Sequence, residues 1–162
     1  MDALEVCIQE ADFDLGAEVR RLREAHRDVG AVVAFLGTVR DYQDRPEGGL
    51  QGLELEHYPG MTESAIQHMI AEARQRFDMK SVRVIHRVGR LNVQDQIVMV
   101  AVASAHRGEA FAACEFLMDY LKTQAPFWKK EWTPQGGQWV DARDSDDRAV
   151  ERWGLKGQGT SQ

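Results

Sequence analysis

Five side chains that can carry positive charge stand where a regular element is expected to begin or end. They come from three separated segments, and they are Arg40, His106, Arg107, Lys122 and Lys129. The protein as a whole carries 20 Lys and Arg against 26 Asp and Glu, a formal net charge of −6. Cations that met in one recess of such an acidic protein would bind an anion, and phosphate is the ligand class that we expect. The overall charge disfavours a nucleic-acid binder.

His106 and Arg107 stand where a buried strand over residues 97–103 gives way to a helix over residues 107–125. The first backbone N–H groups of a helix have no partner within it, and its positive end attracts anions. The position therefore indicates an anion site. A pair of solvated loop residues is the alternative.

Lys122 lies on the flank of the same predicted helix. At 100° per residue, the centre of its apolar stripe is formed by Cys114, Leu117, Leu121 and Ala125. A lysine beside such a stripe can lay its aliphatic stem along apolar surface and deliver its ammonium to a cleft. A lysine that simply extends into solvent is the alternative.

Lys129 belongs to a segment, residues 127–132, that alternates like a strand. In that pattern Lys129 shares a face with Phe127 and Glu131, whereas Lys130 shares the other face with two tryptophans. Lys129 is the lysine that we expect to face the same concavity as the helical lysine, if the chain reverses at the proline after the helix. An edge strand that lysines protect from aggregation is the alternative.

The elements that must position these groups follow from the apolar periodicity. We expect strands over residues 5–9, 31–36, 53–57, 82–86, 97–103, 127–132 and 138–142. Helices are expected over residues 15–22, 62–77 and 107–125. The first strand has the weak alternation of an edge strand, residues 31–36 are apolar on both faces like a buried strand, and Thr62 is the expected N-cap of the second helix. Mixed elements with hairpin-like links predict an α+β fold with a mostly antiparallel sheet.

The length of 162 residues predicts a single domain, residues 1–153, followed by a C-terminal tail, residues 154–162. The longest apolar run is far shorter than the ~20 residues of a membrane helix, and the acidic start is no signal peptide, so we expect a cytoplasmic protein. No nucleotide loop, metal-ligand spacing or cysteine framework is present, so we expect no metal and no cofactor. The two cysteines lie far apart, and Cys114 falls on the predicted core stripe.

Longer blocks around these residues carry a resemblance to a known family. They are GAVV and GTVR (30–33 and 37–40), LEHYPGM (55–61), VIHRVG (84–89), SAHR (104–107) and above all MDYLKTQAPFWKKE (118–131). In these blocks, which run in family order from about residue 30 to residue 153, the sequence resembles the large, catalytic subunit of molybdopterin synthase. The resemblance implies an α/β-hammerhead fold with helices packed on a mostly antiparallel sheet.

The resemblance also implies an enzyme of molybdenum cofactor biosynthesis. Such a sulfurtransferase converts cyclic pyranopterin monophosphate to molybdopterin by inserting two dithiolene sulfurs. The donor is the C-terminal Gly-Gly thiocarboxylate of a small ubiquitin-like subunit, and two large subunits form a homodimer with a small subunit at each end, a heterotetramer. A thiocarboxylate is already a sulfur nucleophile, which explains why the chain needs no reactive cysteine.

Carried over residue by residue, the resemblance implies a set of substrate-binding positions. They are Thr38, Val39, Arg40, His106, Arg107, Lys122, Lys129, Lys130, Glu131 and Arg143. The family often has a lysine where this chain has Thr38. Lys122 and Lys129 are the expected catalytic residues, the first stabilising the thiocarboxylate and the tetrahedral species formed from it, the second orienting substrate or shuttling protons. Arg40, His106 and Arg107 are expected to bind phosphate or pterin.

Two other functions remain compatible with the residues themselves. A non-catalytic adaptor could capture the tail of a ubiquitin-like protein, with the lysines as carboxylate receptors. A phosphate-binding enzyme of unrelated chemistry is disfavoured, because neither a nucleotide loop nor a metal set is present.

Overall fold

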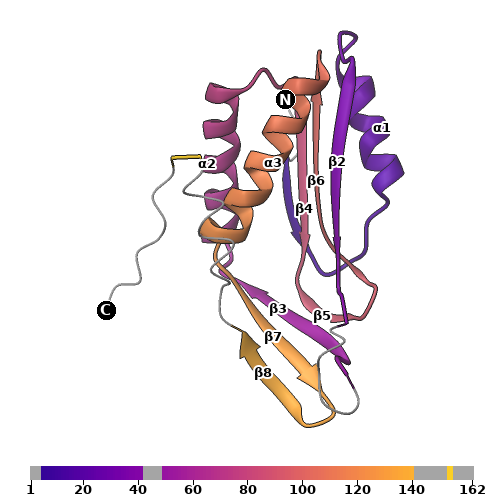
Figure 1. Ribbon diagram of the computed structural model, residues 1–162, viewed down its shortest axis with the longest axis vertical. Coiled ribbons are helices and arrows are strands. Elements are labelled where there is room, and N and C mark those ends of the chain that lie inside the picture. Colours follow the sequence, from indigo (N-terminus) through magenta and orange to yellow (C-terminus); the bar gives the residue numbers. More distant parts are fainter. Residues whose placement is uncertain (1–4, 42–48, 141–152, 155–162) are drawn as a thin grey trace.

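The computed structural model describes residues 5–41, 49–140 and 153–154, and these contain three helices and eight strands (Figure 1). The helices are α1 (Leu15–Ala25), α2 (Met61–Arg76) and α3 (Arg107–Gln124). The strands are β1 (Val6–Gln9), β2 (Ala31–Thr38), β3 (Gly52–His57), β4 (Ser81–Arg87), β5 (Gly89–Asn92), β6 (Gln96–Ser104), β7 (Phe127–Thr133) and β8 (Gly136–Val140). None of the helices in these ranges is long and apolar enough to cross a membrane.

The strands form two four-stranded sheets, in the orders β1-β4-β6-β2 and β5-β3-β7-β8. Every pairing is antiparallel except that of β1 with β4. Figure 1 shows the second sheet below the first, at the end where β2 and α3 finish. The predicted α+β class with mostly antiparallel sheets is confirmed.

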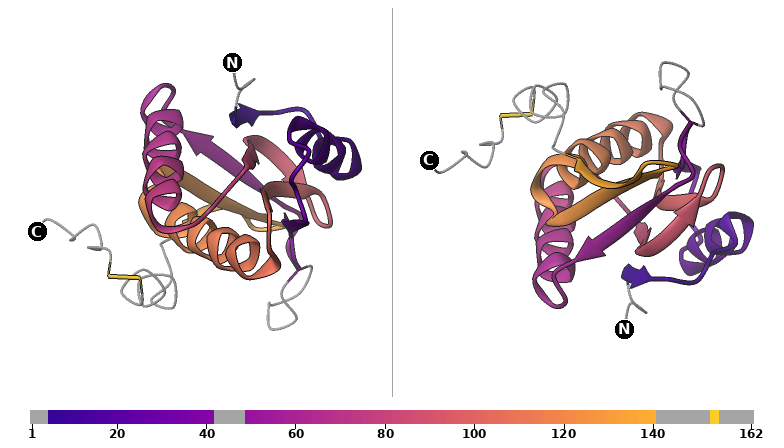
Figure 2. Two further views of the ribbon diagram at one scale, coloured as in Figure 1. Left: turned by 90° about the horizontal axis from the view of Figure 1, so that it is seen from above. Right: turned by 90° about the horizontal axis from the view of Figure 1, so that it is seen from below.

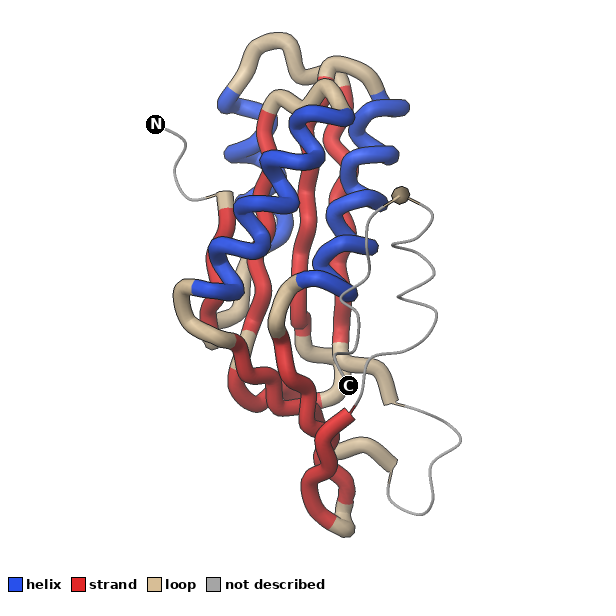
Figure 3. The backbone as a smooth tube through the Cα atoms, turned by 90° about the vertical axis from the view of Figure 1, so that its left-hand side faces the viewer, coloured by secondary structure: helices blue, strands red, loops and turns tan. Residues whose placement is uncertain are grey.

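The first sheet is covered by helices on both faces (Figures 2 and 3). Alternate residues of β6 divide between them: Val98, Val100 and Val102 pack with α2 and α3. Met99, Ala101 and Ala103 pack on the other face with Leu22 of α1. A strand that is buried on both sides needs such a continuous apolar run, so the expectation for residues 97–103 is confirmed.

Two expectations about the elements are wrong. Among the described residues, the apolar strand β2 is an edge strand that pairs only with β6, and Phe35 and Leu36 are each 38% exposed. The N-cap of α2 is Gly60 and not Thr62. Gly60 has a positive φ of 84°, which a glycine adopts without a Cβ penalty, and its N–H donates to Glu63 Oε2 at 2.6 Å.

The link between α3 and β7 is short. The helix ends at Gln124, Ala125 has extended backbone angles, and the N–H of Phe127 donates to the carbonyl of Ala125 at 3.0 Å. This bond closes a three-residue turn around Pro126, whose fixed φ suits that geometry. We call these residues, 125–127, the Pro126 turn. The hairpin expected after β7 is present and turns through residues 134–135.

Candidate active site

The end of β2 is fixed against the second sheet by Val39. Its side chain is 2% exposed and packs with Leu53 and Leu55 of β3. Its N–H donates to the carbonyl of Asp95 at 2.9 Å, and its carbonyl accepts from the N–H of Gln94 at 2.8 Å. Val39 therefore belongs to the core. Its contribution to a site is to fix the backbone position of the residues on either side of it.

The two neighbours, Thr38 and Arg40, are both exposed. They flank the buried valine at the point where the first sheet meets the second (Figure 1). The Arg40 guanidinium is therefore a cation on a backbone that the β5–β6 turn holds in place.

Lys122 lies in the last turn of α3 and is exposed. The predicted apolar stripe is confirmed beside it, because Cys114, Leu117 and Leu121 are buried. The positive charge of this lysine acts on the ring of His86 in β4. Burial lowers the pKa of His86 to about 4, the hydrogen bond to the backbone of Arg87 opposes this, and the positive charge of Lys122 adds to the lowering.

The inward face of β7 carries Phe127, Lys129 and Glu131, as the alternation predicts. On the neighbouring strand β3, Phe127 pairs with His57, Lys129 with Leu55 and Glu131 with Leu53. Both leucines are buried, Glu131 is 6% exposed, and Lys129 is half-buried. Lys129 therefore stands on the face that packs toward the core, beside a buried carboxylate.

Lys130 projects from the opposite face of β7. Its Nζ lies 4.7 Å from the ring centroid of Trp132 and 5.4 Å from that of Trp139, which are cation–π distances. The sheet thus separates its ammonium from the face of Lys129. The structure does not bring Lys130 to the same surface as the other lysines.

The described contacts join these segments into one junction between the two sheets. Phe127 stacks on His86, which lies near Lys122, and Phe127 shares its face of β7 with Lys129. Val39, which precedes Arg40, packs on the leucine that pairs with Lys129. We call this region, with its cations Arg40, Lys122 and Lys129, the junction site.

His106 and Arg107 lie at the other end of α3. His106 is the N-cap and Arg107 the first helical residue, and both are exposed. Lys122 lies fifteen positions after Arg107, so the helix places them about 22 Å apart. Figure 1 shows the start of α3 far from β7. Within a single chain, His106 and Arg107 therefore do not share a recess with Lys122.

Three further observations concern other kinds of site among the described residues: a metal site, a reactive thiol and a cavity. No group of three or more His, Cys, Asp and Glu among them is placed to hold a metal ion. Burial raises the pKa of the Cys114 thiol to about 11, so it is not a thiolate at neutral pH. A cavity of about 410 Å³ lies between α1, β4 and the end of α2, and no predicted site residue lines it. Arg143 lies outside the described residues.

Two buried polar residues at the junction were not expected there. His86 is 8% exposed and Thr62 is fully buried. The sequence did contain a signal for His86, because it continues the inward positions 82 and 84 of its strand. A polar residue on an apolar face needs a partner inside the protein.

Comparisons with known proteins agree with this arrangement. The family model described as MoaE protein matches residues 8–124. A molybdopterin synthase catalytic subunit from Ralstonia nicotianae is 62% identical over 148 residues, which are 91% of this chain and 83% of the relative. A protein of the same name from Pseudomonas aeruginosa is 52% identical over 146 residues, 90% of this chain and 96% of the relative.

Solved structures share the fold. A molybdopterin biosynthesis MoaE protein from Burkholderia ambifaria has a TM-score of 0.78 and 56% identity, covering 93% of this chain and 99% of that one. A molybdopterin synthase from Staphylococcus aureus has a TM-score of 0.78 at 27% identity, covering 86% of this chain and 98% of that one. Because the family model spans most of the chain and close relatives match nine tenths of it, the chain belongs to the MoaE protein family, that of the molybdopterin synthase catalytic subunits.

Proposed function

We propose that this chain is the catalytic subunit of a molybdopterin synthase, which converts cyclic pyranopterin monophosphate to molybdopterin with two sulfurs from a protein thiocarboxylate. The observation that supports the proposal is the junction site, whose elements carry Arg40, Lys122 and Lys129 in a chain with a net charge of −6. Family membership supports the reaction, and the placement of β7 and the end of α3 supports the choice of residues.

The chemistry needs two anions to be held together. A phosphate-bearing pterin and a thiocarboxylate tail repel each other, and fixed cations offset that repulsion without reorganising during the reaction. In this proposal Arg40 binds the phosphate or pterin. Lys122 stabilises the thiocarboxylate and the tetrahedral species formed from it, and Lys129 orients the substrate or shuttles protons. The buried Cys114 is not a thiolate at neutral pH, and in this proposal the sulfur comes from the partner's thiocarboxylate.

The sulfur donor that we propose is a small ubiquitin-like subunit whose C-terminal Gly-Gly carries the thiocarboxylate. A solved structure that shares this fold is described as the protein–protein complex of subunits 1 and 2 of molybdopterin-converting factor from Helicobacter pylori, with a TM-score of 0.70 at 18% identity. We place the reaction in the cytoplasm.

We further propose that two copies of this chain form a homodimer within a heterotetramer, and that His106 and Arg107 act in the partner's site. The support is the exposed edge of β2 with Phe35 and Leu36. An edge strand invites pairing, and two β2 strands paired antiparallel about a two-fold axis lie head to tail. The start of α3 in one copy then lies beside the junction site of the other.

The direct test is reconstitution. The purified chain is mixed with cyclic pyranopterin monophosphate and a small subunit bearing a C-terminal thiocarboxylate, and the dithiolene product is measured by mass spectrometry. Product is expected with the thiocarboxylate and none with the same subunit ending in an ordinary carboxylate. Binding of the small subunit with unchanged pterin would overturn the proposal in favour of a non-catalytic adaptor.

A further inference from the structure

The Pro126 turn is the only covalent link between the helix that carries Lys122 and the strand that carries Lys129. Lys122 lies four positions before Pro126, and Lys129 lies three positions after it. A small rotation in this turn therefore changes the distance between the two ammonium groups. Two side chains from other elements, Thr62 and His86, hold the turn.

Thr62 holds the turn from the first turn of α2. Its Oγ1 donates to the carbonyl of Pro126 at 2.9 Å and accepts from the N–H of Tyr58 at 3.0 Å. A hydroxyl has one donor hydrogen, and here a proline carbonyl takes it. Since Thr62 is fully buried, it cannot touch a substrate and can act only through what it binds.

His86 holds the turn from β4. Its ring lies on the ring of Phe127, with centroids 3.8 Å apart and planes 17° apart. Its Nδ1 is 2.8 Å from the carbonyl of Arg87. Because a carbonyl only accepts, Nδ1 carries the hydrogen, and the orientation of the ring is set by that bond.

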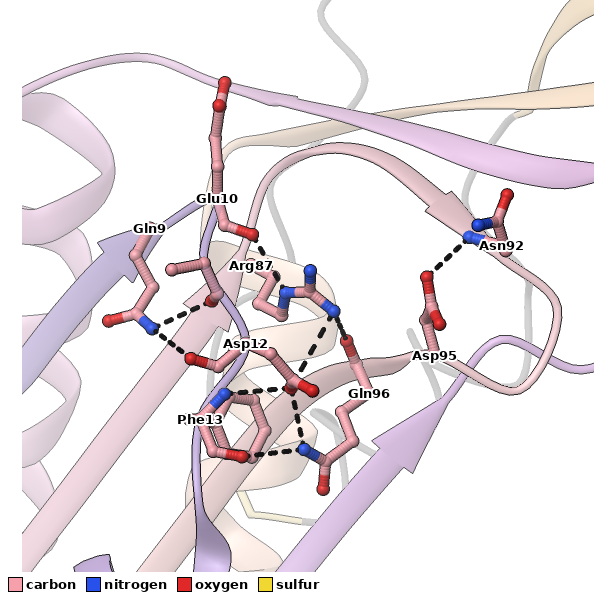
Figure 4. Close-up of polar contacts among 9 residues, drawn as sticks. Gln9, Glu10, Asp12, Phe13, Arg87, Asn92, Asp95 and Gln96 are labelled. Carbon is pink, nitrogen blue, oxygen red and sulfur yellow. Dashed lines mark hydrogen bonds and ion pairs between the residues drawn. The ribbon is translucent and has the colours of Figure 1, made fainter.

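The backbone that orients His86 is itself fixed (Figure 4). The Arg87 side chain donates from Nε to the carbonyl of Glu10 and from Nη1 to the carbonyl of Gln96, each at 3.0 Å. Gln96 in turn donates to Asp12 Oδ1 at 2.8 Å. The chain of contacts thus runs from the β1–α1 loop through β4 to the Pro126 turn.

We propose that Thr62 and His86 are positioning residues that fix the Pro126 turn between them and thereby set Lys122 relative to Lys129. This inference rests on the proposed function, because it takes both lysines to act on one substrate. A displacement of about 1 Å at a reacting group can cost on the order of a hundredfold in rate, so two supports on a short link are enough to matter.

The test compares matched variants. Thr62→Val keeps the shape and removes the hydroxyl, whereas Thr62→Ser keeps the hydroxyl. We expect Thr62→Val to lower kcat about tenfold with little change in KM, and Thr62→Ser to restore kcat to within about twofold. His86→Ala, which removes the stack on Phe127, is expected to lower kcat about tenfold, and His86→Phe, which keeps a stacked ring, less than about threefold.

The control is Ser81→Ala. It removes a hydroxyl that donates to the carbonyl of Leu22 at 3.2 Å and joins β4 to α1, away from the Pro126 turn. It is expected to lower stability and leave kcat unchanged. All rates are measured at a temperature where circular dichroism shows each variant fully folded. If Thr62→Val does not fold, the comparison of kcat between His86→Ala and His86→Phe tests the positioning role.

The outcomes separate the two proposals. If the unaltered chain makes no product, the proposed function fails. If it makes product while folded Thr62→Val and His86→Ala keep its kcat, the positioning role fails alone. A kcat loss that Thr62→Ser does not restore, or one that Ser81→Ala shares, also overturns the positioning role.

Discussion

His86 and Phe127 lie face to face, with ring centroids 3.8 Å apart, although they are 41 positions apart in the chain. The stack closes the apolar core over a histidine and places the first residue of β7. A charged imidazole would be costly there, which explains why burial is the largest cause of its lowered pKa.

Stability should therefore fall as the pH drops below neutral. The pKa of His86 is about 4 in the folded protein against an ordinary 6.5, so the unfolded chain binds the proton first. The free energy of unfolding is therefore unaffected by this group above pH 6.5, where the histidine is neutral in both states, and it decreases as the pH falls toward 4. Between pH 7 and pH 5 this one group is expected to cost about 2 kcal/mol of unfolding free energy.

Urea unfolding of the unaltered chain and of His86→Phe at both pH values measures this effect. The phenylalanine keeps a stacked ring without a titrating group, so its loss of stability between pH 7 and pH 5 should be smaller by that amount. An identical pH dependence in the two proteins would show that His86 is not held neutral.

Cys114 should be dispensable for sulfur transfer. It is buried, its pKa is raised to about 11, and its Sγ lies 3.6 Å from the carbonyl of Val100. We expect Cys114→Ala to keep product formation within about twofold, and iodoacetamide at pH 8 to leave the folded thiol unmodified. Loss of turnover in a folded Cys114→Ala variant would point to a protein-bound sulfur intermediate.

The two neighbouring lysines of β7 should behave differently. Lys129 shares its face with the buried Glu131, whereas the ammonium of Lys130 lies over Trp132 on the other face. Replacement of Lys129 by Ala is therefore expected to lower kcat at least about a hundredfold, and Lys130→Ala less than about tenfold. Single-turnover product formation with saturating small subunit compares them, and equal losses would contradict the assignment of faces.

Activity should return when two inactive variants are mixed. If His106 and Arg107 serve the partner's site, a dimer of one Lys122→Ala chain and one Arg107→Ala chain has one intact site and one with both defects. Random exchange makes half of the dimers mixed, so about a quarter of the original activity is expected. Native mass spectrometry verifies the exchange. Activity no higher than the mean of the two parents would show that each chain completes its own site.

Local patterns in the sequence predicted the parts of the fold that depend on one element and its nearest cover. The apolar run of β6 required burial on both faces, and the alternation of β7 correctly separated Lys129 from Lys130. The stripe on α3 identified the buried face on whose flank Lys122 lies. In each case the periodicity of side chains about one backbone is sufficient.

The misses concern relationships between elements. The apolar residues on both faces of β2 predict that both faces are buried, but they do not show whether the covering residues belong to the same chain. The sequence therefore predicts a central strand, whereas β2 lies at the edge of its sheet. Thr62 is a good N-cap type, but a glycine with positive φ two residues earlier begins the helix and leaves the hydroxyl for Pro126. The four-residue strand β5 is too short for its pattern to show.

The distance between Arg107 and Lys122 was available from the sequence. A helix of 18 residues separates its ends by about 27 Å, so groups near its two ends cannot share one small recess. The placement of the remaining cations depends on where β2 and the Pro126 turn meet the second sheet, and no single element specifies that.

The central claim is that Lys122 stabilises the thiocarboxylate and the species formed from it, and Lys122→Ala tests it most directly. Product formation in a single turnover is measured with saturating thiocarboxylated small subunit and cyclic pyranopterin monophosphate, with Lys80→Ala, whose ammonium pairs with Asp28 at 3.0 Å, as the matched control. We expect the rate to fall at least about a hundredfold in Lys122→Ala, with thermal unfolding and small-subunit binding unchanged, and the control to keep its rate. Product formation by Lys122→Ala at a rate close to that of the control would contradict the account.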